Sequence, residues 1–208
     1  MKTKMKNKQG LLFVLSGPSG CGKGTVVREL LNQNEDIFLS ISATTRLPRD
    51  GEVDGQHYYF LTKEQFEEQI ATDGMLEHAS YCGNYYGTPK DAVMNMCRSG
   101  KDVILEIEVQ GALQIKKKHP DAVLIFILPP SLEELSRRLI DRHTEDMETI
   151  NKRLAKSTEE IRHAKEYDYT VVNDTVLETV EQIESIMEAE KFRSKRMLPM
   201  IDDLFSTK

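Results

Sequence analysis

The chain has 208 residues, of which 39% are hydrophobic and 30% charged, a balance typical of a soluble globular domain whose core needs no disulfides or metals. A formal net charge of −6 argues against nonspecific nucleic-acid binding, and no apolar run approaches the roughly 20 residues of a membrane span. Three cysteines without paired spacing favour reduced thiols. The polar, lysine-rich residues 1–9 lack a signal-peptide core, so we predict a disordered leader and a cytoplasmic protein of unspecified oligomeric state.

A glycine-rich stretch after the first apolar run is the feature around which the chain is organised. The run from Leu11 to Leu15 is typical of a buried parallel strand, and a helical pattern begins near Lys23. Glycines between a strand and a helix let backbone N–H groups converge on an anion, and a lysine there can reach the β- and γ-phosphates. We therefore predict a phosphate-binding loop. It consists of Gly17, Pro18, Ser19, Gly20, Cys21, Gly22, Lys23, Gly24 and Thr25.

The end of this loop departs from the usual pattern. Most such loops have Ser or Thr directly after the lysine to approach Mg²⁺, whereas here Gly24 follows Lys23 and Thr25 comes one residue later. A Gly-Lys-Gly-Thr ending is similar to that of nucleoside monophosphate kinases. It favours a small molecule as the phosphoryl acceptor.

The next segments continue an α/β pattern and then change character. We predict a helix from about Lys23 to Asn32 and a strand from about Phe38 to Ser42. Between about residues 40 and 100, turn-rich and mixed segments indicate an inserted module. Within it we predict a strand over 57–61, a helix over 63–71, a strand over 76–81, and a loop over 83–89 that leads into a helix.

Buried strands and helices alternate over the rest of the chain, which argues for a parallel sheet. Residues 132–164 form a long charged helical region interrupted near 143–145, and charge runs of this kind are usually solvated faces. The apolar tail over 192–208 either docks as a short helix or lies on a partner. The other predicted elements are strands over 102–108, 122–128 and 169–172 and helices over 109–118 and about 177–192.

Several separated motifs resemble those of guanylate kinases, over about residues 10–191. The resemblance rests on the phosphate loop and on segments that occur in the same order in that family. These segments are 42–49 (SATTRLPR) with Gly51, Glu52 and Gly55, 83–88 (GNYYGT), 105–111 (LEIEVQG), 127–131 (ILPPS), 150–154 (INKRL) and 172–174 (VND).

The resemblance implies an α/β P-loop kinase fold with a five-stranded parallel sheet flanked by helices. The core would comprise about residues 10–39, 101–130 and 165–191, the GMP-binding α+β insertion about 40–100 and the helical lid about 131–164. The implied reaction moves the γ-phosphoryl group of ATP to GMP, and to dGMP, giving ADP and GDP. Its transition state spreads negative charge over the phosphoryl oxygens, so positioning and cationic groups suffice for catalysis.

The same resemblance assigns roles to individual residues. The loop and Asn173 would bind ATP, and Mg²⁺ would bridge the phosphates mostly through water, with Thr25 and Glu106 nearby. The implied catalytic residues are Lys23, Arg46, Arg138, Arg142 and Arg153. The implied GMP-binding residues are Ser42, Arg46, Arg49, Tyr58, Glu77, Tyr86, Thr88, Glu106 and Glu108.

Two departures from the family and two alternative functions accompany these assignments. His143 stands where a lid glycine is usual, and Glu108 stands where aspartate is more common. The chain could instead be a noncatalytic interaction module, although such modules lose their phosphate loop, or a kinase for another base. Cys21 lies beside a lysine and a helix start, which favours a thiolate; the competing interpretation is that its side chain points into the core.

Overall fold

The computed structural model describes residues 9–81, 83–141 and 146–206 and is organised around a five-stranded sheet. All neighbouring strands in this sheet are parallel, and the strand order is β2-β7-β1-β8-β9. The central strand β1 pairs Phe13 with Ile104 on one side and with Val123 on the other. The strands are β1 (Leu12–Ser16), β2 (Ile37–Leu39), β7 (Asp102–Glu106), β8 (Val123–Leu128) and β9 (Tyr169–Val172).

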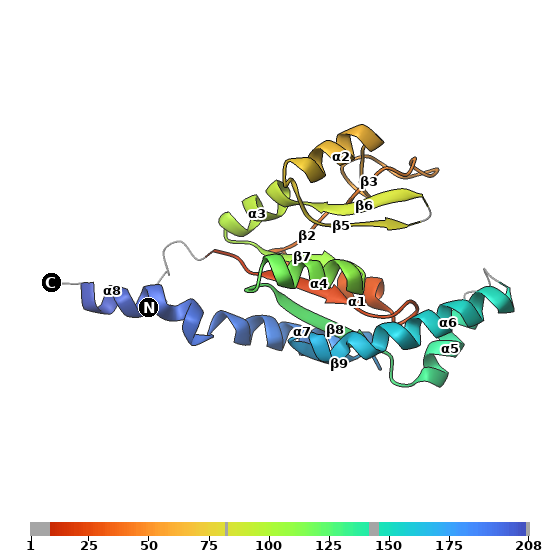
Figure 1. Cartoon of the computed structure of the whole chain (residues 1–208). Coiled ribbons are helices and arrows are strands. Elements are labelled where there is room, and N and C mark those ends of the chain that lie inside the picture. Colours follow the sequence, from red (N-terminus) through yellow and green to blue (C-terminus); the bar gives the residue numbers. More distant parts are fainter. Residues whose placement is uncertain (1–8, 82, 142–145, 207–208) are drawn as a thin grey trace.

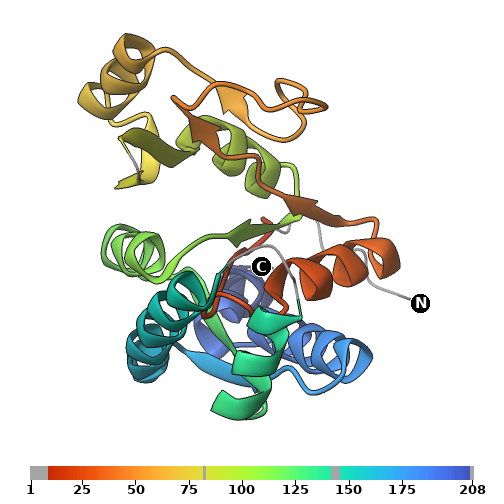
Figure 2. The ribbon, with the colours of Figure 1, turned by 90° about the vertical axis from the view of Figure 1, so that its right-hand side faces the viewer.

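Helices cover both faces of this sheet, so its strands are buried on two sides and read as continuous apolar runs. One face packs against α1 (Lys23–Gln33) and α7 (Val176–Lys191), and the other packs against α3 (Lys90–Arg98) and α4 (Val109–Lys118) (Figure 2). Alternate residues of β1 enter the two cores: Phe13 faces α1 and α7, whereas Val14 faces α3 and α4. The predicted fold class is confirmed.

A second sheet lies above the first in Figure 1 and corresponds to the inserted module. Its strand order is β4-β3-β6-β5, and α2 (Lys63–Ala71) packs on it through Phe66. The strands are β3 (Ala43–Thr44), β4 (Tyr59–Phe60), β5 (Met75–Tyr81) and β6 (Asn84–Pro89). The prediction of a loop over 83–89 was wrong, because its glycines and proline were taken as turn signals while β6 pairs with both β3 and β5.

The charged region after β8 forms two helices beside the phosphate-loop edge of the sheet (Figure 1). Helix α5 (Leu132–Ile140) and helix α6 (Met147–Ile161) share a small core of Leu135, Leu139 and Ile150, and α6 continues into the 3-10 helix η1 (Arg162–Glu166). Within the described residues, no helix has the length and apolarity needed to cross a membrane.

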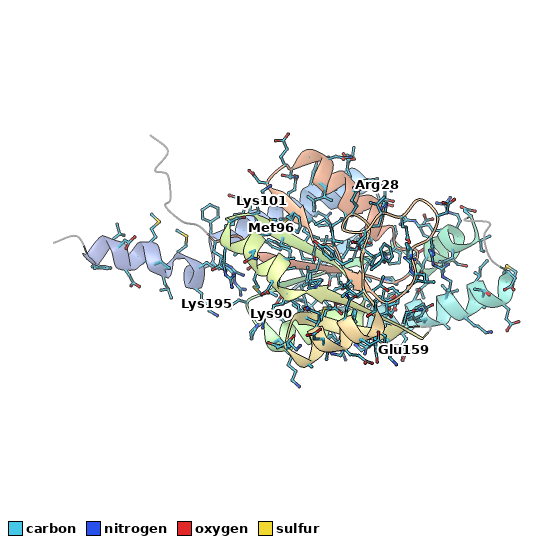
Figure 3. The ribbon with its side chains drawn as sticks, turned by 90° about the horizontal axis from the view of Figure 1, so that it is seen from above. Arg28, Lys90, Met96, Lys101, Glu159 and Lys195 are labelled. Carbon is cyan, nitrogen blue, oxygen red and sulfur yellow. The ribbon has the colours of Figure 1, made fainter. Side chains whose placement is uncertain are left out.

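The tail is helical, but the interpretation that it docks as a short helix holds only for its first turn. Helix α8 (Ser194–Ser206) extends away from the body, with Lys195 near its start (Figure 3). Its first turn is held by ion pairs of Lys195 with Asp121 and of Arg196 with the buried Glu190. Leu204 and Phe205 at its far end are 70% and 81% exposed, so the apolar side of this helix does not dock on the described part of its own chain.

Candidate active site

The glycine-rich loop connects β1 to α1 at the carboxyl edge of the main sheet, where α/β folds bind ligands. Gly20 and Gly22 have φ values of 89° and 87°, a left-handed conformation that other residues rarely adopt. The main chain turns tightly, since the Cys21 N–H donates to the Pro18 carbonyl at 3.2 Å. Helix α1 then begins, and no side chain caps its amino end. The amides of a first helical turn and the positive end of the helix dipole can together bind an anion.

The Cys21 side chain points into the core, not toward the anion site. It is 1% exposed and belongs to the cluster between the sheet, α1 and α7. Burial raises the pKa of the Cys21 thiol above its usual value, although Lys23 opposes this shift. The interpretation of Cys21 as a thiolate was therefore wrong, because removal from water outweighs the nearby positive charge.

Alkylation should consequently be slow at Cys21 in the folded protein, and addition of ATP should not change its rate. A buried, protonated thiol is a poor nucleophile. Labelling at neutral pH followed by mass spectrometry measures this directly, and the same reaction on urea-unfolded protein serves as the control. Rapid ATP-sensitive labelling of the folded protein at Cys21 would contradict the buried position.

Lys23 and two oxygen ligands lie at the start of α1. The Lys23 Nζ lies 3.4 Å from the Gly17 carbonyl oxygen, which folds the side chain back over the loop. A Cβ at Gly24 would lie 3.5 Å from Oε1 of Glu106, so the carboxylate at the end of β7 faces the first turn of α1, where Thr25 is exposed. A hydroxyl and a carboxylate are the oxygen ligands that suit Mg²⁺, directly or through water. The residues present thus fit the expected ion.

Two of the three predicted lid arginines reach the phosphate loop. Arg138 donates to the Asn173 carbonyl at 3.1 Å and to the Cys21 carbonyl at 3.4 Å. Arg153 on α6 donates to the Ser19 hydroxyl at 2.6 Å. Helix α6 is also joined to the loop by the buried Ser157, whose hydroxyl donates to the Ser19 carbonyl at 3.3 Å. The third arginine, Arg142, and the neighbouring His143 lie outside the described residues.

Asn173 supports the phosphate loop through hydrogen bonds. Its amide donates to the Cys21 carbonyl at 2.7 Å, while its oxygen accepts a hydrogen bond from Thr179 at 3.1 Å. The side chain is 3% exposed, and a Cβ at Gly22 would come within 2.5 Å of its nitrogen. This close approach explains why a glycine precedes Lys23. Asn173 therefore fixes the main chain of the loop.

A cluster of Arg46, Glu52 and two tyrosines forms in the inserted module. Its guanidinium makes two parallel hydrogen bonds to Glu52, at 2.8 and 2.9 Å, the strongest geometry for this pair. It also lies over the ring of Tyr58 at 5.3 Å, and Tyr58 meets Tyr86 edge to face with centroids 6.3 Å apart. The hydrogen bond to Glu52 is the main reason why the pKa of Arg46 is raised. Arg46, Tyr58 and Tyr86, predicted separately, are thus neighbours.

The pairing predicts a pH-dependent stability at Glu52. Its hydrogen bonds, first to the Arg46 side chain and then to the Arg49 N–H, lower the pKa of the carboxyl to about 2. A lowered pKa means that the stabilisation is fully present above the unfolded value, about 4.3, and is lost as the pH falls toward 2. Glu52→Gln should therefore unfold at a lower temperature than the parent at pH 7, and this difference in unfolding temperature should narrow below pH 4. Thermal unfolding from pH 7 to pH 3 measures the difference, and a constant value would contradict the role of the Glu52 carboxylate.

A buried carboxylate lies between the inserted module and the core. Glu77 on β5 is 5% exposed, and its Oε1 accepts a hydrogen bond from the Thr88 hydroxyl on β6 at 2.7 Å. Burial raises the pKa of the Glu77 carboxyl, and the hydrogen bond from Thr88 opposes this. Glu77 is therefore not a solvated acid of the surface. Two of the predicted GMP-binding residues are in direct contact with each other.

The remaining predicted residues are less closely joined to these groups. Ser42 directly precedes β3, and its carbonyl accepts the Tyr59 N–H at 2.9 Å. Arg49 is exposed in the turn after β3. Glu108 precedes the first residue of α4, with a 72% exposed side chain that lies 3.3 Å from Lys156 of α6. Their roles toward a nucleotide stay predictions.

Sequence reasoning missed several groups that hold the site together. Glu134 binds Arg138 at 2.7 Å, and their spacing of four residues on a helix was a signal for this pair. Glu52 had no assigned role, and its contact with Arg46 depends on the path of a turn. Ser157 and Lys156 lie in a charged helix whose inner face could not be identified from composition.

The fold and site together define a class of protein. A parallel sheet, a phosphate loop at its carboxyl edge, and arginines from adjoining helices on that loop are features of P-loop phosphotransferases. The Gly-Lys-Gly-Thr ending and the separate inserted module place the chain among nucleoside monophosphate kinases.

Comparison with known proteins gives the family. The guanylate kinase family model matches residues 9–190, so the chain belongs to this family. It is 55% identical over 192 residues to a guanylate kinase of Clostridium perfringens (strain SM101), covering 92% of this chain and 89% of the relative. It is 51% identical to the guanylate kinase of Lactiplantibacillus plantarum, covering 95% and 96% of the two chains.

A solved structure supports the same assignment. The crystal structure of guanylate kinase from Anaplasma phagocytophilum has a TM-score of 0.76 and 34% sequence identity, covering 97% of this chain and 98% of that one. This agreement in sequence and fold does not favour the noncatalytic alternative. The chain is an enzyme of the guanylate kinase family.

Proposed function

We propose that this enzyme transfers the γ-phosphoryl group of ATP to GMP, and to dGMP, yielding ADP and GDP. The observation that carries the proposal is an intact phosphate loop with Lys23 at the start of α1, contacted by arginines from both adjoining helices, in a chain of this family. The inserted module adds Arg46, which we assign to a second anion site, and the buried carboxylate of Glu77. Two phosphate sites are what a phosphoryl donor and acceptor require.

In this mechanism the chain binds the two nucleotides, orients them and neutralises the charge of their phosphates. The loop amides and Lys23 hold the ATP phosphates, while Arg46, Tyr58 and Tyr86 hold the phosphate of GMP. Arg138 and Arg153 stabilise charge on the phosphoryl group as it moves, since a guanidinium fork suits phosphate oxygens. Arg49, Arg142 and Asn173 complete these sites. When bound with ATP, Mg²⁺ would neutralise phosphate charge, held near Thr25 and Glu106.

The base is read at the inserted module. Guanine presents N1–H and N2–H₂ donors next to its O6 acceptor, and carboxylates facing that edge accept these hydrogen bonds. We assign Glu77 and Glu108 to this role, with Ser42 and Thr88 as hydroxyl partners. Adenine has an acceptor at N1 and no N2 amine, so the same carboxylates would repel it.

The parts of the chain have matching roles in the proposal. The main sheet with α1, α4 and α7 is the core, the second sheet with α2 is the GMP-binding insertion, and α5 with α6 is the lid. The substrates are small molecules, the net charge of −6 disfavours nucleic acid as a partner, and the site of action is the cytoplasm.

A coupled assay of ADP release tests the proposal. Purified enzyme with ATP and Mg²⁺ is offered GMP, dGMP, AMP, UMP and CMP in turn. We expect rapid turnover with GMP, weaker turnover with dGMP and little with the others. Equal use of AMP would overturn the assignment of the base, and no ADP release with any acceptor would indicate a noncatalytic module.

A further inference from the structure

Gly111 occupies a place in α4 where glycine is unfavourable for the helix itself. It is the third residue of Val109–Lys118, it is buried, and its φ lies outside the left-handed region, so the backbone there does not require glycine. Alanine is a far better helix former than glycine at an interior position. The reason for a glycine must therefore lie in what packs against this part of the helix.

The neighbour is the carboxylate of Glu77. A Cβ at position 111 would lie 2.7 Å from Oε2 of Glu77, closer than Cβ atoms come to other atoms in proteins. It would also lie in tight contact with the carboxyl carbon of Glu77, at 3.1 Å, and with Cδ1 of Ile107, at 3.3 Å. The other oxygen, Oε1, is held by the Thr88 hydroxyl at 2.7 Å. The carboxylate is thus placed between a hydroxyl on β6 and the bare backbone of α4.

The strand that carries Glu77 cannot easily withdraw from the helix. Gln114, one turn beyond Gly111, accepts a hydrogen bond from the His78 N–H at 3.3 Å and donates one to the His78 carbonyl at 3.0 Å. These two bonds clamp β5 to α4 at the residue next to Glu77. An added methyl group at 111 would therefore displace the Glu77 side chain instead of the strand.

We propose that Gly111 is a positioning residue for base recognition: by lacking a side chain, it lets the Glu77 carboxylate lie where it can accept hydrogen bonds from guanine. This inference rests on the proposed role of Glu77. It assigns Gly111 an effect on the acceptor nucleotide, since the nearest atoms that a Cβ at 111 would meet belong to Glu77 and Ile107 and none belongs to the phosphate loop.

The test is the Gly111→Ala variant of the full chain, assayed by ADP release with GMP, AMP and ATP varied in turn. We expect kcat/KM for GMP to fall about tenfold or more, since polar groups that should pair with substrate become misplaced. The KM for ATP should stay within about twofold, as expected for a change confined to acceptor binding. Lys117→Ala, an exposed change on the same helix, is the control and should match the parent.

Gly111→Ala is also made in the Glu77→Ala variant. This double variant separates displacement of the Glu77 side chain from general damage to the helix. In Glu77→Ala the added methyl group meets no carboxylate, so Gly111→Ala should cause no further loss of GMP use there, and the double variant should unfold at the same or a higher temperature than Glu77→Ala. Losses that multiply in the double variant would overturn the inference, as would parental GMP use by Gly111→Ala. This comparison holds even where Gly111→Ala alone folds poorly.

The outcomes also separate this inference from the function on which it rests. If Glu77→Ala itself keeps the parental kcat/KM for GMP, the base-reading role of Glu77 is wrong and the inference falls with it. If Glu77→Ala is impaired while Gly111→Ala matches the parent, Glu77 reads the base and only the positioning role of Gly111 is refuted.

Discussion

Replacing Lys23 by alanine should lower kcat at least about a hundredfold while the chain still folds. The ammonium group lies over the phosphate loop, 3.4 Å from the Gly17 carbonyl, where it can follow charge onto the β- and γ-oxygens. Removing one preorganised electrostatic contact of this kind costs about 2.7–4 kcal/mol of transition-state stabilisation. The measurement is ADP release at saturating ATP and GMP, with circular dichroism to check the fold.

Lys101→Ala is the matched control for loss of a lysine. Lys101, labelled in Figure 3, directly precedes β7 and so lies at the amino edge of the parallel sheet, opposite the loop. It should retain parental turnover. Near-normal kcat in folded Lys23→Ala would refute the role of the loop lysine in catalysis.

Glu77→Ala should weaken GMP use and narrow the ratio of GMP to AMP turnover, mainly through GMP. A buried acceptor that pairs with a substrate donor discriminates strongly against an analogue that leaves it unpaired, often by about 10⁴. Because Glu77 is 5% exposed, water cannot take over its hydrogen bonds. We expect kcat/KM for GMP to fall by roughly two to four orders of magnitude while the KM for ATP changes little.

The control for this variant is Glu64→Ala, which removes an acid near the amino end of α2 on the same module. Parental kcat/KM for GMP in Glu77→Ala would remove Glu77 from the base site. A matching loss in Glu64→Ala would show that the net charge of the module, and not one placed carboxylate, controls GMP use.

Local sequence patterns predicted the bounds of several elements. The bounds of α2, α4 and β9 agree with prediction, because helical or apolar periodicity in each is uninterrupted. Strand β6 was missed, since Gly83 and Pro89 read as turn signals whereas pairing with two neighbouring strands decides the conformation. Tertiary context outweighed local propensity there.

The candidate site was likewise predicted only in part from the sequence. Recurring family motifs indicated which residues gather, and the structure brings Arg46, Tyr58 and Tyr86 together as expected. Motifs do not show which way a side chain points: Cys21 faces the core, although its neighbours in sequence bind anions. Some contacts depend on the path of a turn or on which face of a charged helix points inward. The contact of Arg46 with Glu52 is of this kind and could not be predicted from the sequence.

The strand order of the main sheet constrains when the catalytic loop can form during synthesis. Strand β1 pairs with β7 on one side and β8 on the other, and the hydrogen bond between Leu11 and Asp102 joins residues 91 apart in the chain. At translation rates of about 5–20 residues per second, β1 waits roughly 5–20 seconds for its first partner. An apolar strand is unpaired for that time. We therefore expect the inserted module, whose β5 and β6 are adjacent in sequence, to acquire structure on the ribosome before the phosphate loop does.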